Sequence, residues 1–455
     1  MINKVNIYIL LGAIFMAALI VRIYPVIAIP EKNNNGFGIY GDSYLYHVIA
    51  YNIYSGHGFS GSNTGKAFGS DSGGKVLKYE PAVTRGPIYP FFIASVYRFL
   101  GDTKSTVSGE IWRNNWDRVR ITQCVLDSFV CLLVFFMARL IYPRSYGPAL
   151  IAALVYCFNF YNIFYARALL SESISTFMLT LSILFCTLSL VRGKLYWYIL
   201  SGAGLGLTAL TRMEYIFFPF FFAAYIFFSN KSRLSEAVKR SAVFLTAFVM
   251  IVLPWSIRNY IVFKKPIPVA IGALGHNLFM GTIETNTNWR SWDALPDSPF
   301  VSEETRAKIA SIHLPYINAA LSGGMGTEHY ESYFMKLAMD NIRHHPIVCI
   351  KTWIMRIPRL WYQNYIPMYG YREASGGFFI FYFVFALYAF YKGAGSERFL
   401  MGVVWILFAY VTLLFMPFHI EPRYGVSLMP VIITLAGIGC FKIFYRGECQ
   451  CRKIS

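Results

Sequence analysis

The sequence predicts an all-α polytopic membrane protein with about ten transmembrane helices. Of its 455 residues, 56% are hydrophobic and only 14% are charged, whereas soluble domains carry roughly a quarter charged residues. The mean hydropathy is +0.46. Long apolar segments recur along the chain and approach the roughly 20 residues that a helix needs to cross the hydrocarbon core. Composition and segment length therefore indicate the same fold class.

The predicted spans begin close to the N-terminus. Residues 5–28 form an apolar run that is longer than the core of a signal peptide and lacks a small-residue cleavage motif, so we expect a retained span. The other spans are predicted at 119–138, 147–165, 173–191, 196–211, 214–229, 241–257, 376–391, 399–417 and 425–444.

The charges of the short loops orient these spans. With a cytoplasmic N-terminus, the inside segments are "ARLIYPRSYG", "VRGK", "SNKSRLSEAVKR", "YKGAGSER" and "FKIFYRGECQCRKIS", and every one is net positive. The outside turns "ARALLSES", "TRMEY" and "HIEPRYG" each carry one Arg and one Glu. Loops rich in Lys and Arg stay on the cytoplasmic side. We therefore predict cytoplasmic N- and C-termini, an extracytoplasmic active site and residence in the plasma (inner) membrane.

Two long segments then lie outside and divide the chain into three parts. Residues 1–257 form a membrane module with its first outer loop at 29–118, residues 258–375 form the second outer loop, and residues 376–455 hold the last helices. The loops contain apolar stretches at 85–101 and 344–365, and we expect both to be helices that lie in the outer interface. A true span at 85–101 is the alternative, and it would invert the topology downstream.

Composition also argues against other classes of protein. The net charge is +18, but the basic residues are spread over loops between apolar segments, which disfavours nucleic-acid binding. Most of the eight cysteines lie within apolar segments, so no disulfide framework is expected. Cys449 and Cys451 form a C-x-C with no second pair, which we interpret as two cytoplasmic thiols.

A polar stretch, "GIYGDSYLYHVIAYNIYSGHGFS" at 38–60, follows the first span. Its aromatic and apolar residues recur at helical spacing after Asp42, which places Asp42 at the cap or in the first turn of a helix. Two interpretations of Asp42 are open on this pattern alone. It caps the helix, or it is a carboxylate at the membrane surface that acts on a substrate anchored in the bilayer.

Further charged residues gather where other spans leave the membrane on the same side. They are Arg167 and Glu172, Arg212 and Glu214, Arg258, and His419 with Glu421 and Arg423. Solvation of an ordinary loop would explain any one of them. Together they form a mouth that suits an anionic lipid headgroup, because Arg binds phosphate through two parallel hydrogen bonds. Asp127 is an exception within a span, and we expect it to face protein and to be paired.

At this point the sequence resembles the GT-C glycosyltransferases, especially bacterial members similar to the protein mannosyltransferases and to the aminoarabinose transferase of lipid A. The resemblance rests on seven motifs in the same order. They are "DSYLYHVIAYNIYSGHGFS", "TRGPIYPFF", "RITQCVLDSFVCLLVFFMARLIY", "LLSES", "GLGLTALTRMEY", "LPWSIRNY" and "EPRYGVSLMP". There are two departures: Gly86 stands where the family has a first Pro, and Ser43 replaces a Glu that many protein mannosyltransferases carry.

The resemblance implies a role for each matched residue. Asp42 and Glu172 would be catalytic, with Asp42 as general base or as the ligand of a divalent metal, the one cofactor left open. The lipid phosphate would be bound by Arg423, Arg258 and Arg85, although Gly86 weakens the match at Arg85. The acceptor or sugar pocket would be lined by Tyr46, His47, Tyr89, His419 and Tyr424.

The expected function is transfer of a sugar, hexosyl or pentosyl, from a polyprenyl-phosphate-linked donor to an acceptor hydroxyl at the outer membrane surface. The acceptor is a lipid, a glycan or a protein, and Ser43 gives a protein acceptor less support. Two alternatives use the same anionic lipid: a flippase or transporter of lipid-linked saccharides, and an O-antigen ligase or polymerase. A transporter often carries inverted repeats, and the sequence shows no internal repeat.

Overall fold

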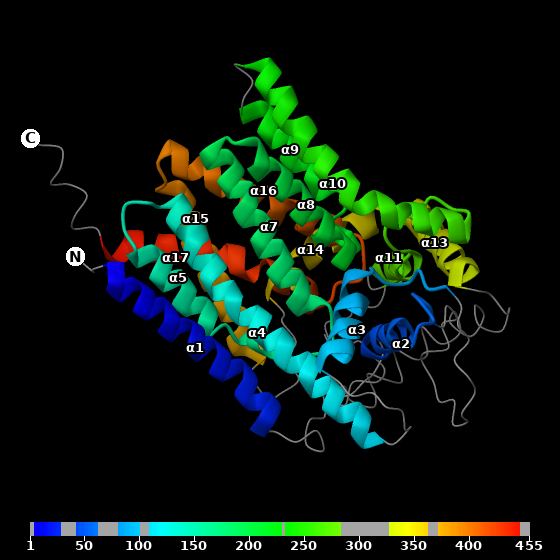
Figure 1. Ribbon diagram of the computed structural model, residues 1–455. Coiled ribbons are helices and arrows are strands. Elements are labelled where there is room, and N and C mark those ends of the chain that lie inside the picture. Colours follow the sequence, from blue (N-terminus) through cyan, green and yellow to red (C-terminus); the bar gives the residue numbers. More distant parts are fainter. Residues whose placement is uncertain are drawn as a thin grey trace, which may run out of the picture.

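The computed structural model describes residues 4–28, 42–61, 81–100, 109–229, 233–283, 327–362 and 372–445 (Figure 1). These residues fold into helices, and the β contact found among them is an isolated bridge between Ser60 and Pro81. The predicted all-α class is therefore confirmed. Parts of both outer loops (62–80 and 284–326), together with Cys449 and Cys451, lie outside the described residues.

The helices alternate between long apolar elements and shorter ones. In chain order they are α1 (Lys4–Ala28), α2 (Asp42–Tyr54), α3 (Ile88–Leu100), α4 (Gly109–Ile141), α5 (Gly147–Cys157), α6 (Phe160–Arg167), α7 (Glu172–Arg192), α8 (Leu195–Thr211), η3 (Met213–Tyr215), α9 (Phe218–Ser229), α10 (Leu234–Phe263), α11 (Leu274–Ile283), α13 (Thr327–His344), α14 (Pro346–Tyr362), α15 (Arg372–Tyr391), α16 (Gly395–Phe415), η4 (Pro422–Leu428) and α17 (Met429–Phe444).

Six helical stretches in the described part of the chain are long and apolar enough to cross a membrane. They are Asn6–Ala28, Trp116–Ile141, Glu172–Arg192, Leu234–Phe263, Gly395–Phe415 and Arg423–Phe444. The pair α5 and α6, bent by 47°, would make a seventh. The other predicted spans correspond to shorter helices: α8, Met213–Ser229 and Phe378–Tyr391. The chain is thus a multi-pass membrane protein, and the number of ten spans stays a prediction.

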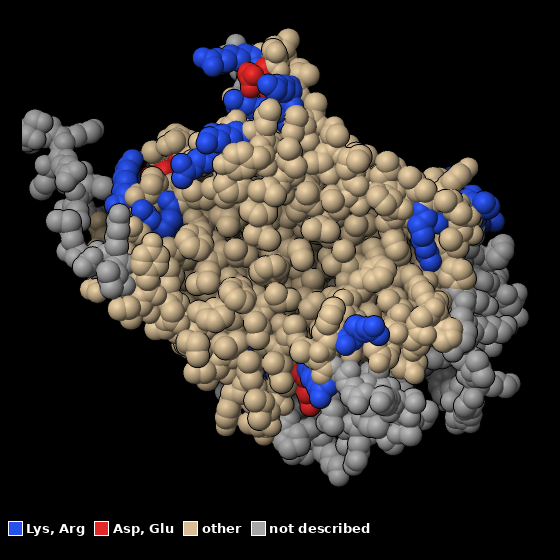
Figure 2. Space-filling model, viewed as in Figure 1, with Lys and Arg blue, Asp and Glu red and all other residues tan. Residues whose placement is uncertain are grey.

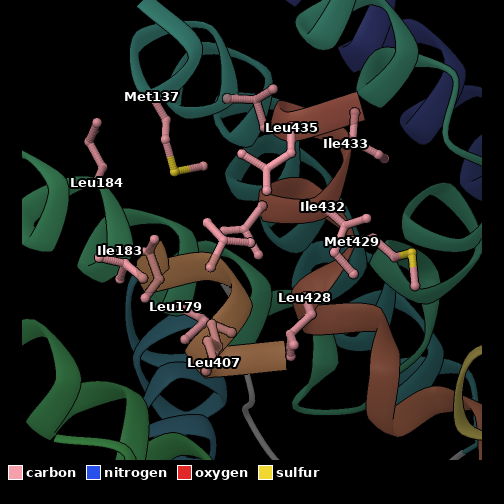
Figure 3. Packing of buried hydrophobic residues seen from close by; sticks show 14 of the residues in the cluster. Met137, Leu179, Ile183, Leu184, Leu407, Leu428, Met429, Ile432, Ile433 and Leu435 are labelled. Atoms are coloured by element: carbon pink, nitrogen blue, oxygen red, sulfur yellow. The ribbon is translucent and has the colours of Figure 1, made fainter. Parts of the chain in front are cut away.

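The apolar core is built around α17. Its side chains Met429, Ile432, Ile433 and Leu435 are almost fully buried, and they belong to one hydrophobic cluster with residues of three other helices (Figure 3). These partners are Met137 on α4, Leu179 and Ile183 on α7, and Leu407 on α16. Because η4 runs directly into α17, this packing fixes the segment that carries Arg423.

Two glycines bring α8 unusually close to α10. A Cβ on Gly202 would lie 2.2 Å from the carbonyl oxygen of Phe244, and one on Gly206 would lie 2.8 Å from Ile251. Small residues spaced by four positions allow such approach between membrane helices. Replacing either glycine would push α8, and with it Arg212 at its C-terminal end, away from α10.

The outer surface of the long helices is apolar. On α10, side chains such as Val249, Met250 and Ile261 are exposed, and Figure 2 shows a broad band with few charged residues across the middle of the molecule. Lys and Arg gather instead where α9 and α10 protrude (Figure 2), and the start of α10 carries Arg233, Lys239 and Arg240. This distribution fits a lipid-facing band with a basic end.

Asp127 is paired inside the helix bundle, as predicted. Arg22 on α1 donates to Asp127 Oδ2 over 2.6 Å, and both side chains are buried. Arg22 also donates to the carbonyl of Cys157 at the end of α5, over 2.9 Å. The pair therefore ties α1 and α4 to the place where α5 bends into α6.

Both stretches expected in the outer interface are helices. The first, α3, has 13 residues and reaches about 20 Å at 1.5 Å per residue, too short to span a hydrocarbon core of about 30 Å. The second, α14, packs against η4 and α15. Their position relative to the lipid surface stays a prediction.

Candidate active site

The charged residues of the outer turns meet at helix ends. Asp42 and Glu172 are the first residues of α2 and α7, where the partial positive charge of a helix N-terminus favours a carboxylate. Arg212 follows the last residue of α8. These ends come from distant parts of the chain. The complete group, here called the acid–arginine cluster, consists of Asp42, Arg85, Glu172, Arg212, Glu214, Glu421 and Arg423.

Arg423 is the centre of the acid–arginine cluster. Its Nη2 donates to Asp42 Oδ2 over 2.8 Å. Its Nε lies 2.5 Å from Glu421 Oε2 and 3.7 Å from Glu172 Oε1. One guanidinium thus holds three carboxylates that belong to α2, to α7 and to the segment before η4.

Arg85 and Arg212 complete the charge pattern on either side. Arg85 donates to the other oxygen of Asp42, Oδ1. Arg212 contacts Glu172 Oε1 at 3.0 Å and also donates to Glu214. Four carboxylates therefore surround three guanidinium groups, and the cluster carries a formal net charge of −1.

The surroundings keep Asp42 ionised. Burial alone would raise the pKa of its carboxyl, but Arg85 and Arg423 outweigh burial and hold the pKa well below its usual range. The side chain is still 30% exposed, so a substrate can reach it. At neutral pH, Asp42 is therefore a carboxylate that accepts hydrogen bonds at both oxygens.

Three buried atoms of the cluster have no hydrogen-bond partner within the described part of the chain: Arg85 Nε, Arg423 Nε and Glu172 Oε2. An unsatisfied buried polar atom costs about 1–3 kcal/mol, so such atoms are a mark of sites that take a polar ligand. The two arginine nitrogens are donors and the glutamate oxygen is an acceptor. A ligand with both an anionic and a hydroxyl group would satisfy them.

Gly86 allows the Arg85 segment to approach the end of α8. A Cβ at Gly86 would lie 2.4 Å from the carbonyl oxygen of Leu210 and 3.0 Å from that of Thr211. Any side chain there would force the two segments apart. The departure from the family motif at Gly86 is thus compatible with Arg85 in the cluster.

Two tyrosines predicted for the pocket line the cluster. The ring of Tyr46 lies 5.6 Å from the guanidinium of Arg85, and its hydroxyl donates to Ser171 over 3.2 Å. The ring of Tyr424 lies 5.7 Å from Arg212 and 5.9 Å from Arg423. Cation–π contacts of this kind hold a guanidinium in place with little loss of its hydrogen-bonding capacity.

The structure places the other predicted site residues at the edge of the cluster or away from it. His419 Nε2 lies 4.0 Å from Glu421. His47 is buried among aromatic rings, where it bonds Tyr97 over 2.8 Å, and burial lowers its pKa to about 4. Tyr89 is fully buried and donates to Gln123 over 2.7 Å. We therefore expect His47 and Tyr89 to support the pocket from behind.

Arg258 has a different environment from the other predicted phosphate ligands. It donates to the carbonyl oxygens of Ala82 (2.8 Å) and Phe59 (3.1 Å), and its guanidinium lies over Trp255 at 4.9 Å. These contacts tie α10 to the segment that leads to Arg85. The structure thus supports Arg258 as a residue that positions this segment.

Three members of the cluster were predicted as part of the charged mouth but received no individual role from the sequence: Arg212, Glu214 and Glu421. The sequence did contain a signal for them, because each neutral outer turn pairs one Arg with one Glu. What the sequence could not show is that the turns converge on one another.

A divalent metal fits this arrangement poorly. Both oxygens of Asp42 already accept from guanidinium groups, and no group of three His, Cys, Asp or Glu side chains in the described residues is arranged to hold a metal ion. No step of the reaction is therefore derived through a metal.

The chain resembles one protein family in part of its sequence and several solved structures in its fold. The sequence model of the dolichyl-phosphate-mannose-protein mannosyltransferase family matches residues 87–257, a stretch that contains Glu172 and Arg212. No curated protein sequence matches the chain.

Among solved structures, the oligosaccharyltransferase AglB from Archaeoglobus fulgidus, in complex with an inhibitory peptide and a dolichol-phosphate, superimposes with a TM-score of 0.56 at 12% identity. The match covers 96% of this chain and 50% of AglB. The apo form of the A. fulgidus oligosaccharyltransferase superimposes with a TM-score of 0.55 at 13% identity, over 96% of this chain and 51% of that one.

The chain has a GT-C glycosyltransferase fold. It spans about half the length of these structural relatives. ArnT from Cupriavidus metallidurans, bound to undecaprenyl phosphate, overlaps at a TM-score of 0.38 and 12% identity, over 97% of this chain and 78% of ArnT. That overlap is too weak to support a structural comparison.

Proposed function

We propose that this GT-C protein is a glycosyltransferase that moves a sugar from a polyprenyl-phosphate-linked donor to an acceptor hydroxyl at the outer membrane surface. The observation that carries the proposal is the acid–arginine cluster. Three guanidinium groups and the carboxylate of Asp42 meet beside Glu172 and Arg423, the first residues of two helical stretches that are long and apolar enough to cross a membrane. This is where the headgroup of a membrane lipid would lie.

The negative charge of the leaving group accounts for the three arginines in the cluster. When the bond between the sugar and the phosphate breaks, negative charge grows on the phosphate. Arg85, Arg212 and Arg423 are held in fixed positions by carboxylates and tyrosines. Positive groups that are oriented beforehand stabilise such developing charge without reorganisation. A phosphate is already a good leaving group, so no strong general acid is needed.

The acceptor hydroxyl requires a base, and we assign Asp42 to this role. A carboxylate with two arginine partners is a weak base, since both partners stabilise its ionised form. When the donor phosphate binds beside them, its negative charge offsets the positive charge of Arg85 and Arg423 at Asp42, so the pKa of Asp42 rises. The acceptor oxygen then attacks the anomeric carbon, the sugar–phosphate bond breaks, the proton moves to Asp42, and polyprenyl phosphate leaves as an anion.

The donor class has independent support in the relatives. One solved structure of AglB is a complex with a dolichol-phosphate. For the chain itself, the positive inside loops support an extracytoplasmic site with cytoplasmic termini in the plasma (inner) membrane. The assay described next also determines whether the sugar is a hexose or a pentose. It determines as well whether the acceptor is a lipid, a glycan or a protein.

The proposal is tested with purified protein in liposomes. Polyprenyl-phosphate-linked hexose and pentose donors are supplied with lipid, glycan and protein fractions as acceptors. We expect release of polyprenyl phosphate together with a new glycoside for one donor class. A transporter would move the lipid across the bilayer and form no glycoside, and that result would contradict the proposal.

A further inference from the structure

Three carboxylates of the acid–arginine cluster are of the kind that bind divalent cations, but an arginine lies between them and they are not arranged to hold a metal ion. Asp42, Glu172 and Glu421 converge from three separate segments. Carboxylate oxygens gathered around one point are the usual ligands of hard divalent cations. Here the guanidinium of Arg423 lies between the three carboxylates, with Nη2 2.8 Å from Asp42 and Nε 3.7 Å from Glu172 and 2.5 Å from Glu421.

We propose that Arg423 takes the place of a divalent cation between Asp42, Glu172 and Glu421, so that no metal ion binds in the cluster and guanidinium groups alone stabilise the leaving phosphate. The statement about metal binding stands on the geometry of the cluster. The statement about the leaving phosphate rests on the proposed function.

Geometry and charge both lead to this assignment. A guanidinium is planar and permanently charged, and a cation at the same point would have to displace it and would be repelled by it. The cluster's net charge of −1 is too small to attract a divalent ion strongly against three fixed positive groups. Removing Arg423 changes both conditions, since the formal charge becomes −2 and the centre between the three carboxylates is vacated.

The arginine is also well fixed in its position. Its ring contact with Tyr424 and its place in η4, directly before the buried helix α17, restrict its movement. A flexible surface arginine could swing away and admit a metal. Arg423, which is only 19% exposed and shared by three carboxylates, is held in place.

The experiment measures binding of Mn²⁺ by electron paramagnetic resonance to the purified full-length protein. We expect wild type to bind no Mn²⁺ at the cluster and Arg423→Ala to gain a site at least tenfold tighter than any that wild type shows. The double variant Arg423→Ala with Asp42→Asn should lose the gained site. Arg423→Gln serves as a second variant if Arg423→Ala fails to fold, and it should gain the same site.

A matched control is Arg144→Ala, because Arg144 also lies beside a carboxylate, Glu397, at 3.9 Å, but is exposed and outside the cluster. It should bind Mn²⁺ as wild type does. The proposal is overturned if wild type binds Mn²⁺ and Asp42→Asn abolishes that binding, or if neither Arg423 variant gains a site. These outcomes do not depend on transfer activity, so failure of the proposed function is recognised separately.

A second measurement uses the reaction. Transfer by wild type should change less than twofold when a chelator is added. A loss of tenfold or more that added Mn²⁺ restores would overturn the proposal, even if the binding experiment had shown no site.

Discussion

Arg423 donates a 2.8 Å hydrogen bond to Asp42 although 381 positions separate the two residues in the chain. The bond joins the first helix after the first membrane span to the segment before the last one. It therefore closes the acid–arginine cluster only when the complete set of helices is assembled. The proposed chemistry and the completed fold depend on the same contact.

The fork shape of Arg423 is expected to matter as well as its charge. Arg423→Lys keeps one positive charge but cannot contact Asp42, Glu172 and Glu421 at once. We expect the apparent affinity for a short-chain polyprenyl phosphate to fall about tenfold, equivalent to ~1.4 kcal/mol, with the protein still folded. Competition binding measures this. An unchanged affinity in Arg423→Ala would place the phosphate site elsewhere, and Arg258 would be the next residue to test.

The buried pair Arg22 and Asp127 is expected to contribute strongly to stability. Asp127→Asn leaves the Arg22 charge buried without its counter-ion, and breaking such a pair costs about 3–5 kcal/mol. The melting temperature in detergent should fall markedly, and a double replacement by apolar residues, Arg22→Met with Asp127→Leu, should recover most of it. Asp117→Asn is the control, since Asp117 is 43% exposed beside Arg120. An Asp127→Asn protein as stable as this control would contradict the prediction.

Asp127 also shows what could be predicted from the sequence. A charge inside an apolar segment must be paired, so the existence of a partner was predictable. Its identity was not, because Arg22 is 105 positions away and only the packing of α1 against α4 brings them together. Apolar segment length predicted where helices occur, but several of them are shorter than a full span.

The acid–arginine cluster, too, could be predicted from the sequence only in part. The motifs pointed to Asp42, Glu172, Arg85 and Arg423, and the structure brings these four together. Arg212 was predicted only as part of the charged mouth, because its contact with Glu172 arises from the convergence of the end of α8 with the start of α7. His47 lies on the same helix as Asp42, but it turns toward the aromatic core formed with α3 and α4.

Glu331 predicts a pH dependence of stability. Its carboxylate accepts from the backbone N–H groups of Gly275 (2.7 Å) and His276 (3.4 Å), yet burial raises its pKa to about 7. The folded state therefore holds the proton more tightly than the unfolded state. The stability that this contributes is complete below pH ~4.5 and is lost as the pH rises toward 7.

The corresponding measurement compares melting temperatures between pH 5 and pH 7.5. The decline should be smaller in Glu331→Gln than in wild type, because the amide does not titrate and its oxygen can still accept both hydrogen bonds. Glu236→Gln, at a 40% exposed side chain, should leave the decline as it is in wild type. Equal declines in wild type and Glu331→Gln would show that Glu331 is not the titrating group.

The topology predicts which positions an impermeant thiol reagent can reach in intact cells. Ser55, after α2, and Ser235, at the start of α10, are both exposed. In a background without native cysteines, Ser55→Cys should be labelled from outside and Ser235→Cys only after the membrane is permeabilised. The reverse pattern would invert the orientation derived from the loop charges.

Asp42→Asn in the transfer assay tests whether the acid–arginine cluster is catalytic. Asn caps the N-terminus of a helix about as well as Asp does, so a purely structural Asp42 should tolerate the change. An amide, however, cannot take a proton from the acceptor. We expect glycosyl transfer per molecule of monodisperse protein to fall by about 10²- to 10⁴-fold, while Asp117→Asn stays near wild type. Turnover of Asp42→Asn close to that of wild type would show that Asp42 only caps α2 and that the proposed mechanism is wrong.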